Sequence, residues 1–297
     1  MATIAETTAA VKAHAAPIGR RLKAGACALR RRPARHRRPT IPAIQSPSFV
    51  AACGLIAALA AIAVIDPLVR LHPGLAAGSL TDRILTALTS FGEGVEMLVG
   101  AALVVFAAAA LDPARLGRRA LAGLAELAGT AAFAFVAIAG SGLIGSLIKN
   151  FYGRARPAHI GGEAVFELHT FAFRAKYASF PSGHSTTAGA TAVVLALLFP
   201  RYARPILAAG VVVAVTRILL EAHFPADVIA GLTLGAVVTL ALAHALARRG
   251  RVFGWGADGR LRLRPLAAPA AWFDTLAAVL ADLKRTRAPV TPLRRDA

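Results

Sequence analysis

Six apolar segments, each close to the length that crosses a lipid bilayer, constrain the fold of this 297-residue chain more than any other feature. A spanning helix needs about 20 mostly apolar residues, and a backbone inside lipid must satisfy all of its hydrogen bonds internally. Only helices and closed barrels do so, and these segments lack the alternation of apolar and polar residues that barrel strands show. The segments are roughly 49–65, 95–111, 121–148, 184–199, 205–220 and 227–246. The sequence therefore predicts an all-α, polytopic membrane protein with a bundle of six transmembrane helices.

The formal net charge of +19 is the second unusual feature, because such a charge is typical of nucleic-acid-binding proteins. Hydrophobic residues make up 57% of the chain and charged residues 16%, which is too apolar for a soluble basic domain. Residues 1–47 carry ten Lys or Arg against one acid, and residues 248–297 carry eleven against four, so the two tails hold +16 of the total. Basic flanks of apolar spans are typical of cytoplasmic segments that are attracted to anionic lipid. We therefore expect the bilayer as the partner of this charge, and no nucleic acid.

Charge and hydropathy divide the chain into three parts. Residues 1–47 are predicted to be a disordered, basic cytoplasmic tail, residues 48–247 the membrane core, and residues 248–297 a second basic cytoplasmic tail. In the second tail, apolar residues recur at helical spacing and predict an amphipathic helix near 270–286. This helix either lies on the inner leaflet as an interfacial helix or packs against the cytoplasmic end of the bundle.

Positive charges in the short loops predict the orientation of the bundle. With both tails on the cytoplasmic side, the arginines in the loops after the second and fourth spans also lie inside. The long loop after the third span lies outside and is nevertheless cationic, with Lys149, Arg154, Arg156, Arg174 and Lys176. Long loops cross a membrane whatever their charge, but a cationic cluster on the outer side also indicates an anionic ligand.

Three groups of polar residues, far apart in the sequence, stand at the predicted outer ends of the spans. They are Lys149 with Arg156, then Ser182, Gly183 and His184, then Arg217, His223 and Asp227. Lys149, Arg156 and Arg217 supply enough positive charge to neutralise a phosphate dianion, and Arg binds phosphate oxygens in a bidentate fork. Ser182 is suited to cap the fourth helix, and Gly183 lets backbone N–H groups at that helix end approach an anion. The sequence therefore predicts a phosphate-binding site at the outer face.

Two histidines and an aspartate supply the chemistry of a nucleophilic site. Pro225 suits the first turn of the sixth helix, which places Asp227 in that turn and His223 just before it. Asp227 can hold one ring nitrogen of His223, so that the other nitrogen is free to attack, and His184 can protonate a departing oxygen. Each residue alone has a structural explanation, such as a helix cap, an interfacial histidine or an outward-reaching arginine. No structural role requires all of these residues to occur together, so their combination favours a functional role.

Other ionisable residues in or beside the spans are less telling. Glu93 and Glu96, near the outer end of the second span, are candidates to line the site or to hold one of its arginines. For Glu126 in the third span and His244 in the sixth, hydrogen bonds between helices are the better explanation. The chain has two cysteines, which argues against a disulfide framework and against a cysteine metal site.

The three groups also have a distinctive order and spacing. The chain reads Lys149-Asn-Phe-Tyr-Gly-Arg-Ala-Arg156-Pro157, then Pro181-Ser-Gly-His184, then Thr216-Arg217-Ile-Leu-Leu-Glu-Ala-His223-Phe-Pro-Ala-Asp227. This pattern resembles the three-part motif of the type 2 phosphatidic acid phosphatase and vanadium haloperoxidase superfamily. The one departure is Thr216, where the family usually has Ser. Thr keeps a hydroxyl for a phosphate oxygen, so we expect this residue to tune the site.

The resemblance implies a phosphatase that needs no metal ion or other cofactor and that acts through a phosphohistidine. In this scheme His223 is the nucleophile, Asp227 orients it, and His184 is the general acid for the leaving oxygen. The resemblance assigns the binding of the phosphate oxygens to Lys149, Arg156, Ser182, Gly183 and Arg217. Positioning and charge stabilisation carry most of the catalysis of phosphoryl transfer, which fits a site so rich in cations.

Six spans favour the branch of integral membrane lipid phosphatases, which hydrolyse lipid phosphomonoesters or diphosphates. The candidate substrates are phosphatidic acid, phosphatidylglycerophosphate, undecaprenyl diphosphate and the phosphates of lipid A, and the sequence ranks neither these nor an oligomeric state. We expect a bacterial inner-membrane protein with cytoplasmic termini and a periplasmic active site. Two alternatives are a vanadate-dependent haloperoxidase and a non-catalytic membrane anchor whose basic tails bind lipid or nucleic acid.

Overall fold

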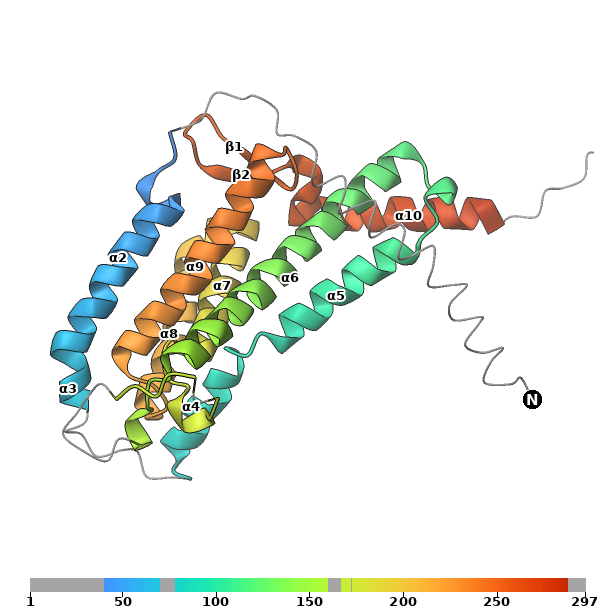
Figure 1. Ribbon diagram of the computed structural model, residues 1–297. Coiled ribbons are helices and arrows are strands. Elements are labelled where there is room, and N and C mark those ends of the chain that lie inside the picture. Colours follow the sequence, from blue (N-terminus) through green and yellow to red (C-terminus); the bar gives the residue numbers. More distant parts are fainter. Residues whose placement is uncertain (1–39, 70–77, 160–166, 172, 288–297) are drawn as a thin grey trace, which may run out of the picture.

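The three-dimensional structure is a computed structural model that describes residues 40–69, 78–159, 167–171 and 173–287. Most of the first basic tail therefore lies outside the described residues. The described part is a bundle of long helices, with connecting loops at one end and a β-hairpin at the other (Figure 1).

The first long helix is composite, because α2 (Pro47–Ala60) continues through the π-helical segment η2 (Ala61–Ile65) into α3 (Asp66–Val69). The other long helices are α5 (Val95–Ala110), α6 (Arg118–Tyr152), α7 (Gly183–Leu198), α8 (Ala203–Leu219) and α9 (Pro225–Arg248). Further elements are α4 (Leu80–Ser90), α10 (Trp272–Arg287) and the antiparallel strands β1 (Phe253–Trp255) and β2 (Leu261–Leu263). Short 3₁₀ turns are η1 (Ala43–Gln45), η3 (Pro113–Arg115), η4 (Pro157–His159), η5 (Ala175–Tyr177), η6 (Pro200–Tyr202), η7 (Pro265–Ala267) and η8 (Pro269–Ala271).

Five helical stretches among the described residues are long and apolar enough to cross a membrane, namely 47–69, 80–110, 118–152, 200–219 and 225–248. Large apolar side chains such as Leu55, Leu147 and Val212 are exposed on them, as a lipid-facing surface requires. The predicted helical membrane fold is thus confirmed. α7 has 16 residues, about 24 Å at 1.5 Å per residue, so the count of six spans depends on this helix and stays a prediction.

The segment between the first and second predicted spans contains α4, a helix that the apolar pattern did not predict. α4 begins after Ser79, whose hydroxyl oxygen accepts a hydrogen bond from the N–H of Asp82 (3.2 Å), a typical helix N-cap. α4 packs against α8. Near its end, Thr89 accepts a hydrogen bond from Nη1 of Arg217 (3.3 Å), so α4 supports one of the predicted site residues.

α7 lies at the centre of the bundle and packs against α6, α8 and α9. Glycines permit the close approach of α7 to α9. A Cβ atom added at Gly235 would lie 2.2 Å from the carbonyl oxygen of Thr186, and one added at Gly189 would lie 2.6 Å from that of Leu232. Small residues allow such backbone contact between membrane helices. The contact also brings the N-terminal ends of α7 and α9 together.

At the opposite end, the β-hairpin closes the bundle through polar contacts. Nε1 of Trp255 donates to Nδ1 of His244 (3.3 Å), and the other ring nitrogen of His244 lies 2.9 Å from the carbonyl oxygen of Gln45. Glu126 of α6 accepts a hydrogen bond from the N–H of Val252 (3.1 Å). His244 and Glu126 thus bind segments that flank the bundle, and the expectation of hydrogen bonds between helices is wrong for both.

α10 packs along the N-terminal part of α6. Val279 is buried in a small apolar cluster with Ala120 and Leu124. Phe273 and Leu280 of the same helix are exposed. α10 therefore packs against the bundle and also offers apolar side chains to its surroundings, two features that the sequence presented as alternatives.

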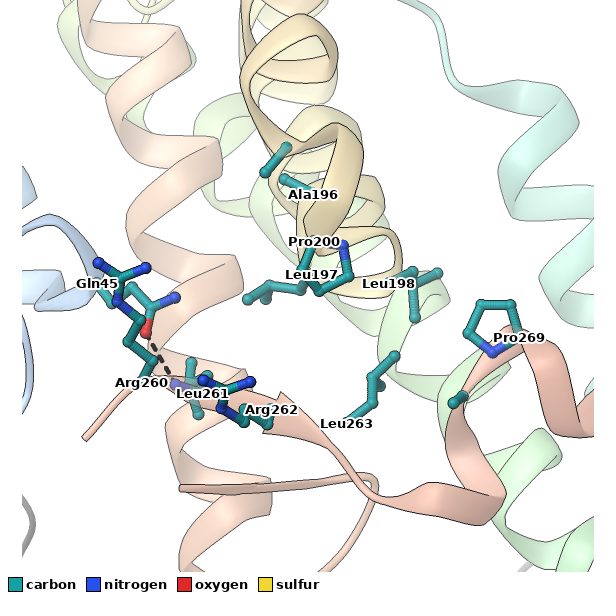
Figure 2. A pocket seen from close by; sticks show the side chains of 12 residues that line it. Gln45, Ala196, Leu197, Leu198, Pro200, Arg260, Leu261, Arg262, Leu263 and Pro269 are labelled. Carbon is teal, nitrogen blue, oxygen red and sulfur yellow. Dashed lines mark hydrogen bonds between the residues drawn. The ribbon is translucent and has the colours of Figure 1, made fainter. Parts of the chain in front are cut away.

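A cavity of about 440 Å³ lies at the hairpin end, between β2 and the C-terminal end of α7 (Figure 2). Leu197, Leu263 and Arg262 are among its lining residues. At its edge, the side-chain oxygen of Gln45 accepts a hydrogen bond from the N–H of Leu261 (2.8 Å). Because the predicted site residues of α7 stand at the start of this helix, the cavity is one helix length away from them.

Candidate active site

The end of the bundle opposite the hairpin gathers the residues of all three sequence motifs. Lys149 lies in the last turn of α6, His184 in the first turn of α7, and Arg217 in the last turn of α8. His223 directly precedes α9, and Asp227 lies in its first turn. In Figure 1 these helix ends lie together at the bottom of the bundle.

The segment that follows α6 positions Arg156. Gly153 ends α6 with a φ of +62°, and a Cβ atom added there would lie 1.7 Å from the carbonyl oxygen of His169, so only glycine fits. The N–H of His169 donates to the carbonyl of Gly153 (2.8 Å), and the N–H of Arg156 donates to the carbonyl of Lys176 (2.9 Å). Backbone pairing within the loop therefore fixes this arginine at the end of the bundle.

His223 is almost completely buried, with 2% of its side chain exposed. Its Nδ1 lies 3.8 Å from Oδ2 of Asp227, too far for a hydrogen bond, and 3.4 Å from Oγ of Ser179. Ser179 donates a hydrogen bond to the same Asp227 oxygen at 2.5 Å. A serine hydroxyl thus links the two residues, with Nδ1–H of His223 directed at Ser179. This arrangement favours the tautomer that leaves Nε2 of His223 unprotonated.

Burial lowers the pKa of the His223 imidazole to about 4. The negative charge of Asp227 opposes this shift, whereas the positive charges of Arg156 and Lys149 add to it. Because a pKa of about 4 lies well below neutral pH, the ring is neutral at pH 7. A buried, neutral imidazole with a free Nε2 has the properties of a nucleophile.

Three cationic side chains surround the same space. The Nζ atom of Lys149 lies 3.2 Å from the position of a Cβ atom added at Gly183, so the ammonium group lies beside the first residue of α7. The Nε atoms of Arg156 and Arg217 are buried and have no hydrogen-bond partner within the described part of the chain. Burial lowers the pKa of Arg156, although a guanidinium stays charged in proteins. Buried donors without partners are destabilising, and the oxygens of an anion would satisfy them.

The N-terminus of α7 adds backbone donors to this space. Ser182 is the N-cap, and its Oγ accepts hydrogen bonds from the N–H (3.4 Å) and the hydroxyl (2.9 Å) of Ser185. The N–H of Ser182 donates to the carbonyl oxygen of Asp227 (3.0 Å). The positive end of the helix dipole therefore stands next to His223, in a position suited to an anion.

The remaining predicted residues lie around this centre. His184, with 31% of its side chain exposed, is more open than His223, and its Nε2 lies 3.7 Å from Oε1 of Glu93. Glu96 lies in the first turn of α5 and is exposed. Thr216 is buried and donates its hydroxyl to the carbonyl of Val213 (2.6 Å) in its own helix. The structure thus brings Glu93 to a histidine and turns the hydroxyl of Thr216 toward its own backbone.

Asp66, Arg154 and Ser179 are buried polar residues at this end that were not among the predicted site residues. Arg154 binds Asp227 (2.6 Å) and Asp66 (2.8 Å) through its two terminal nitrogens. Arg154 stands inside the first motif, and Asp66 directly follows the first apolar segment, where an ionisable residue needs a partner. Those two features of the sequence indicate that Arg154 and Asp66 belong to the site, whereas no feature of the sequence distinguishes Ser179.

The arrangement is suited to nucleophilic displacement at a phosphorus atom. A neutral imidazole supplies the nucleophile, a second imidazole can carry a proton, and three cations with a helix N-terminus can bind three phosphate oxygens. Among the described residues, no group of three or more His, Cys, Asp or Glu side chains is arranged to hold a metal ion.

Comparisons with known proteins agree with this chemistry. The PAP2 superfamily model matches residues 130–251. The chain is 38% identical over 176 residues to each of two proteins named lipid A 1-phosphatase, from Rhizobium johnstonii and Rhizobium etli, over 58% of this chain and 70% and 74% of theirs. A solved structure of a transmembrane PAP2 type phosphatidylglycerolphosphate phosphatase from Bacillus subtilis has a TM-score of 0.47 and 19% identity, over 67% of this chain and 94% of that one. The chain therefore belongs to the PAP2 superfamily, the family that its motifs resemble, and is a membrane phosphatase.

Proposed function

We propose that this phosphatase removes the 1-phosphate of a lipid A-type glycolipid at the outer face of the bacterial inner membrane, with His223 as the nucleophile. One observation carries the proposal, namely a buried neutral imidazole next to cationic N–H groups that lack partners. The choice of lipid is supported by the two relatives named lipid A 1-phosphatase, which are 38% identical to this chain. We expect other lipid phosphates to be poorer substrates.

Binding places the phosphate group over the N-terminus of α7. Lys149, Arg156 and Arg217 neutralise its charge, and the backbone N–H of Gly183 lies at the helix end that attracts anions. Because these donors are held by the fold before substrate arrives, little reorganisation is needed as charge develops on the phosphoryl oxygens.

In the first chemical step, Nε2 of His223 attacks the phosphorus atom. The bond from phosphorus to the lipid oxygen breaks as the bond to nitrogen forms, and His184 gives a proton to the departing oxygen. The attacking ring gains positive charge in this step. The Asp227 carboxylate stabilises that charge through Ser179, whose hydroxyl lies next to Nδ1–H of His223 and donates to the carboxylate.

In the second step, water hydrolyses the phosphohistidine. His184, having lost its proton, takes one from the water molecule, whose oxygen attacks phosphorus and displaces Nε2 of His223. Inorganic phosphate leaves, and both imidazoles return to their starting states. The 3.7 Å contact between Glu93 and His184 suits Glu93 to stabilise the protonated form of this histidine.

The orientation of the bundle supports an active site outside the cytoplasm. The turns η3 and η6, which carry Arg115 and Arg201, lie at the hairpin end with the start of α2, opposite the N-terminus of α9 (Figure 1). The positive-inside rule assigns the hairpin end to the cytoplasm.

Phosphate release from a panel of lipids tests the proposal. The purified protein in detergent is offered lipid A with its 1-phosphate, phosphatidic acid, phosphatidylglycerophosphate and undecaprenyl diphosphate. We expect kcat/KM to be highest for lipid A, and His223→Ala to abolish release from every lipid. His169→Gln is the matched control, because this partly exposed histidine lies in the loop between α6 and α7 and outside the proposed site.

Three outcomes contradict the proposal. Full activity of His223→Ala would show that His223 is not the nucleophile. A clear preference for another lipid would contradict the assignment of lipid A as the substrate. Complete loss of activity in EDTA would contradict the metal-independent mechanism. Vanadate should inhibit phosphate release by occupying the phosphate site, whereas halide oxidation by the vanadate-loaded protein would favour a haloperoxidase.

A further inference from the structure

Three charged side chains are completely buried behind His223, and one of them comes from the first membrane helix. Asp66, Arg154 and Asp227 each have 0% of their side chains exposed. Nη1 of Arg154 donates to Oδ1 of Asp227 (2.6 Å), and Nη2 donates to Oδ2 of Asp66 (2.8 Å). The planar guanidinium therefore bridges two carboxylates and fixes their relative positions.

The first helix also binds the catalytic segment directly. Oδ1 of Asp66 accepts a hydrogen bond from the N–H of Ala226 (3.1 Å) in the first turn of α9. The guanidinium carbon of Arg154 lies 4.3 Å from the ring centroid of Phe224, the residue that follows His223. Asp66 therefore holds the backbone of the short segment from His223 to Asp227. Arg154 holds the ring of Phe224 and the Asp227 carboxylate in the same segment.

The local backbone delivers Asp66 to this place. Within residues 47–69, the only buried residues are Ala58, Ala61 and Asp66, so most of the first helix faces outward. The π-helical segment Ala61–Ile65 directly precedes Asp66. Such a segment inserts an extra residue into a helical turn, rotates the residues that follow, and is frequent at functional sites. The one charged side chain of this helix is thereby turned into the bundle at the end that holds the histidines.

The charges of the three groups explain why a second carboxylate is present. A buried carboxylate or guanidinium needs a partner, so Arg154 stabilises Asp227 in its ionised form. Arg154 alone would also cancel the negative charge that stabilises a developing imidazolium on His223. With Asp66 included, two carboxylates and one guanidinium carry a net charge of −1. Asp66 thus restores the charge that Asp227 would have alone and keeps the geometry fixed.

We propose that Asp66 is a positioning residue of the active site, which acts through Arg154 and the first turn of α9 to fix Asp227 and His223. This role rests on the proposed function of His223 as the nucleophile. It extends the active site to the first membrane helix, which lies outside the segment matched by the family model. It also means that the chemistry depends on a helix that touches no phosphate oxygen.

Asp66→Asn is the test variant, because it removes the charge and keeps the shape and the oxygen that accepts from Ala226. We expect kcat for phosphate release to fall about 100-fold, the effect of a small misplacement of a reacting group. KM and the inhibition constant of vanadate should change by less than about threefold, because the phosphate-binding cations Lys149, Arg156 and Arg217 are untouched. Asp82→Asn is the matched control, since it removes the same charge from the first turn of α4 and should leave kcat unchanged.

A double variant separates positioning from general damage. If Asp66 acts through Arg154, the loss of kcat in Asp66→Asn/Arg154→Gln is far smaller than the product of the two single losses. If the loss of kcat in the double variant equals the product of the two single losses, the two residues act independently and the proposal is overturned. If Asp66→Asn does not accumulate as folded protein, Asp66→Glu keeps the charge on a longer side chain. A lowered kcat with unchanged vanadate inhibition then supports the proposal, and an unchanged kcat overturns it.

The outcomes distinguish this inference from the proposed function. If the wild type releases phosphate and His223→Ala does not, but folded Asp66→Asn retains the wild-type kcat, only the positioning role fails. A parallel loss of kcat and vanadate binding in Asp66→Asn also overturns it, because the damage would then extend to the phosphate site. If the wild type releases no phosphate from any lipid, the proposed function itself fails.

Discussion

The contact between His223 and Asp227 runs through a third residue. Nδ1 of His223 is 3.8 Å from the nearest carboxylate oxygen, and the hydroxyl of Ser179 lies between the two groups at 3.4 Å and 2.5 Å. A hydroxyl donates one proton and accepts others, so it can pass the orienting effect of the carboxylate to the ring. The tautomer of His223 therefore depends on Ser179 as well as on Asp227.

Ser179→Ala is expected to lower kcat/KM about tenfold. The change leaves a buried carboxylate oxygen and a buried imidazole N–H short of a partner, which costs about 1–3 kcal/mol, and each 1.4 kcal/mol of barrier is a factor of ten. Steady-state phosphate release measures the loss. Ser179→Thr keeps the hydroxyl and should restore most of the activity, while Ser146→Ala on the exposed face of α6 is the neutral control. An unchanged rate in Ser179→Ala would show that His223 and Asp227 interact directly during catalysis.

The sequence predicted the residues that meet at this end but not the residues that hold them there. Lys149, His184 and His223 stand in motifs whose spacing is visible along the chain, and the topology of the spans brings those motifs to one level. Asp66 and Arg154 are 88 positions apart, and their contact depends on the rotation of the helix after a π-helical segment. A hydropathy pattern contains no information on that rotation.

At the scale of elements, the contact between α7 and α9 sets the geometry of the site. Both helices begin beside His223, and the backbones approach so closely that Gly235 has no room for a side chain. The N–H of Ser182 then reaches the carbonyl oxygen of Asp227 at 3.0 Å. The distance between the phosphate-binding end of α7 and the histidine at the start of α9 is thus fixed by small residues several turns away.

Gly235→Ala is expected to destabilise the protein by about 1–3 kcal/mol and to lower kcat, because the added methyl group overpacks this helix contact. Its Cβ would lie 2.2 Å from the carbonyl oxygen of Thr186 and 2.5 Å from the backbone nitrogen of Ala190. Gly140→Ala in α6 is the matched control, since no neighbouring atom lies within 4 Å of its Cβ position and alanine favours a helix. Thermal unfolding in detergent measures both variants. Equal unfolding temperatures for the two would contradict a close-packed contact.

The long apolar elements were predictable, and the short ones were not. Segments such as 121–148 exceed the length of a span and match α6 closely, because hydropathy over many residues averages out local exceptions. β1 and β2 have three residues each, too few for an alternating pattern to be recognised. They form beside α9 because His244 and Glu126 offer hydrogen-bond partners to Trp255 and Val252, which only the folded bundle supplies.

At the scale of the whole molecule, the positive charges fall into two groups that have different roles. The net charge of +19 lies mostly in the two tails, whereas the cations with a proposed catalytic task are Lys149, Arg156 and Arg217. The first tail joins the bundle at the hairpin end, where the carbonyl oxygen of Gln45 meets His244. His223 stands at the opposite end of the same helix, α9. The point where the first tail joins the bundle and the active site are thus separated by about the length of a 24-residue helix, roughly 36 Å.

Deletion of residues 2–39 is therefore expected to leave kcat and KM for phosphate release in detergent within about twofold of the wild type. The tail joins the bundle about one helix length from the active site, and exposed charges more than a Debye length apart, about 8 Å at physiological ionic strength, are largely screened. Full-length and shortened proteins are compared at equal concentration, with His223→Ala in each form as the inactive reference. In vesicles that contain anionic lipid, the shortened protein should lose the attraction of its tail to the inner leaflet. A tenfold or greater loss of activity in detergent would place the tail in the catalytic machinery and contradict the separation of charge described above.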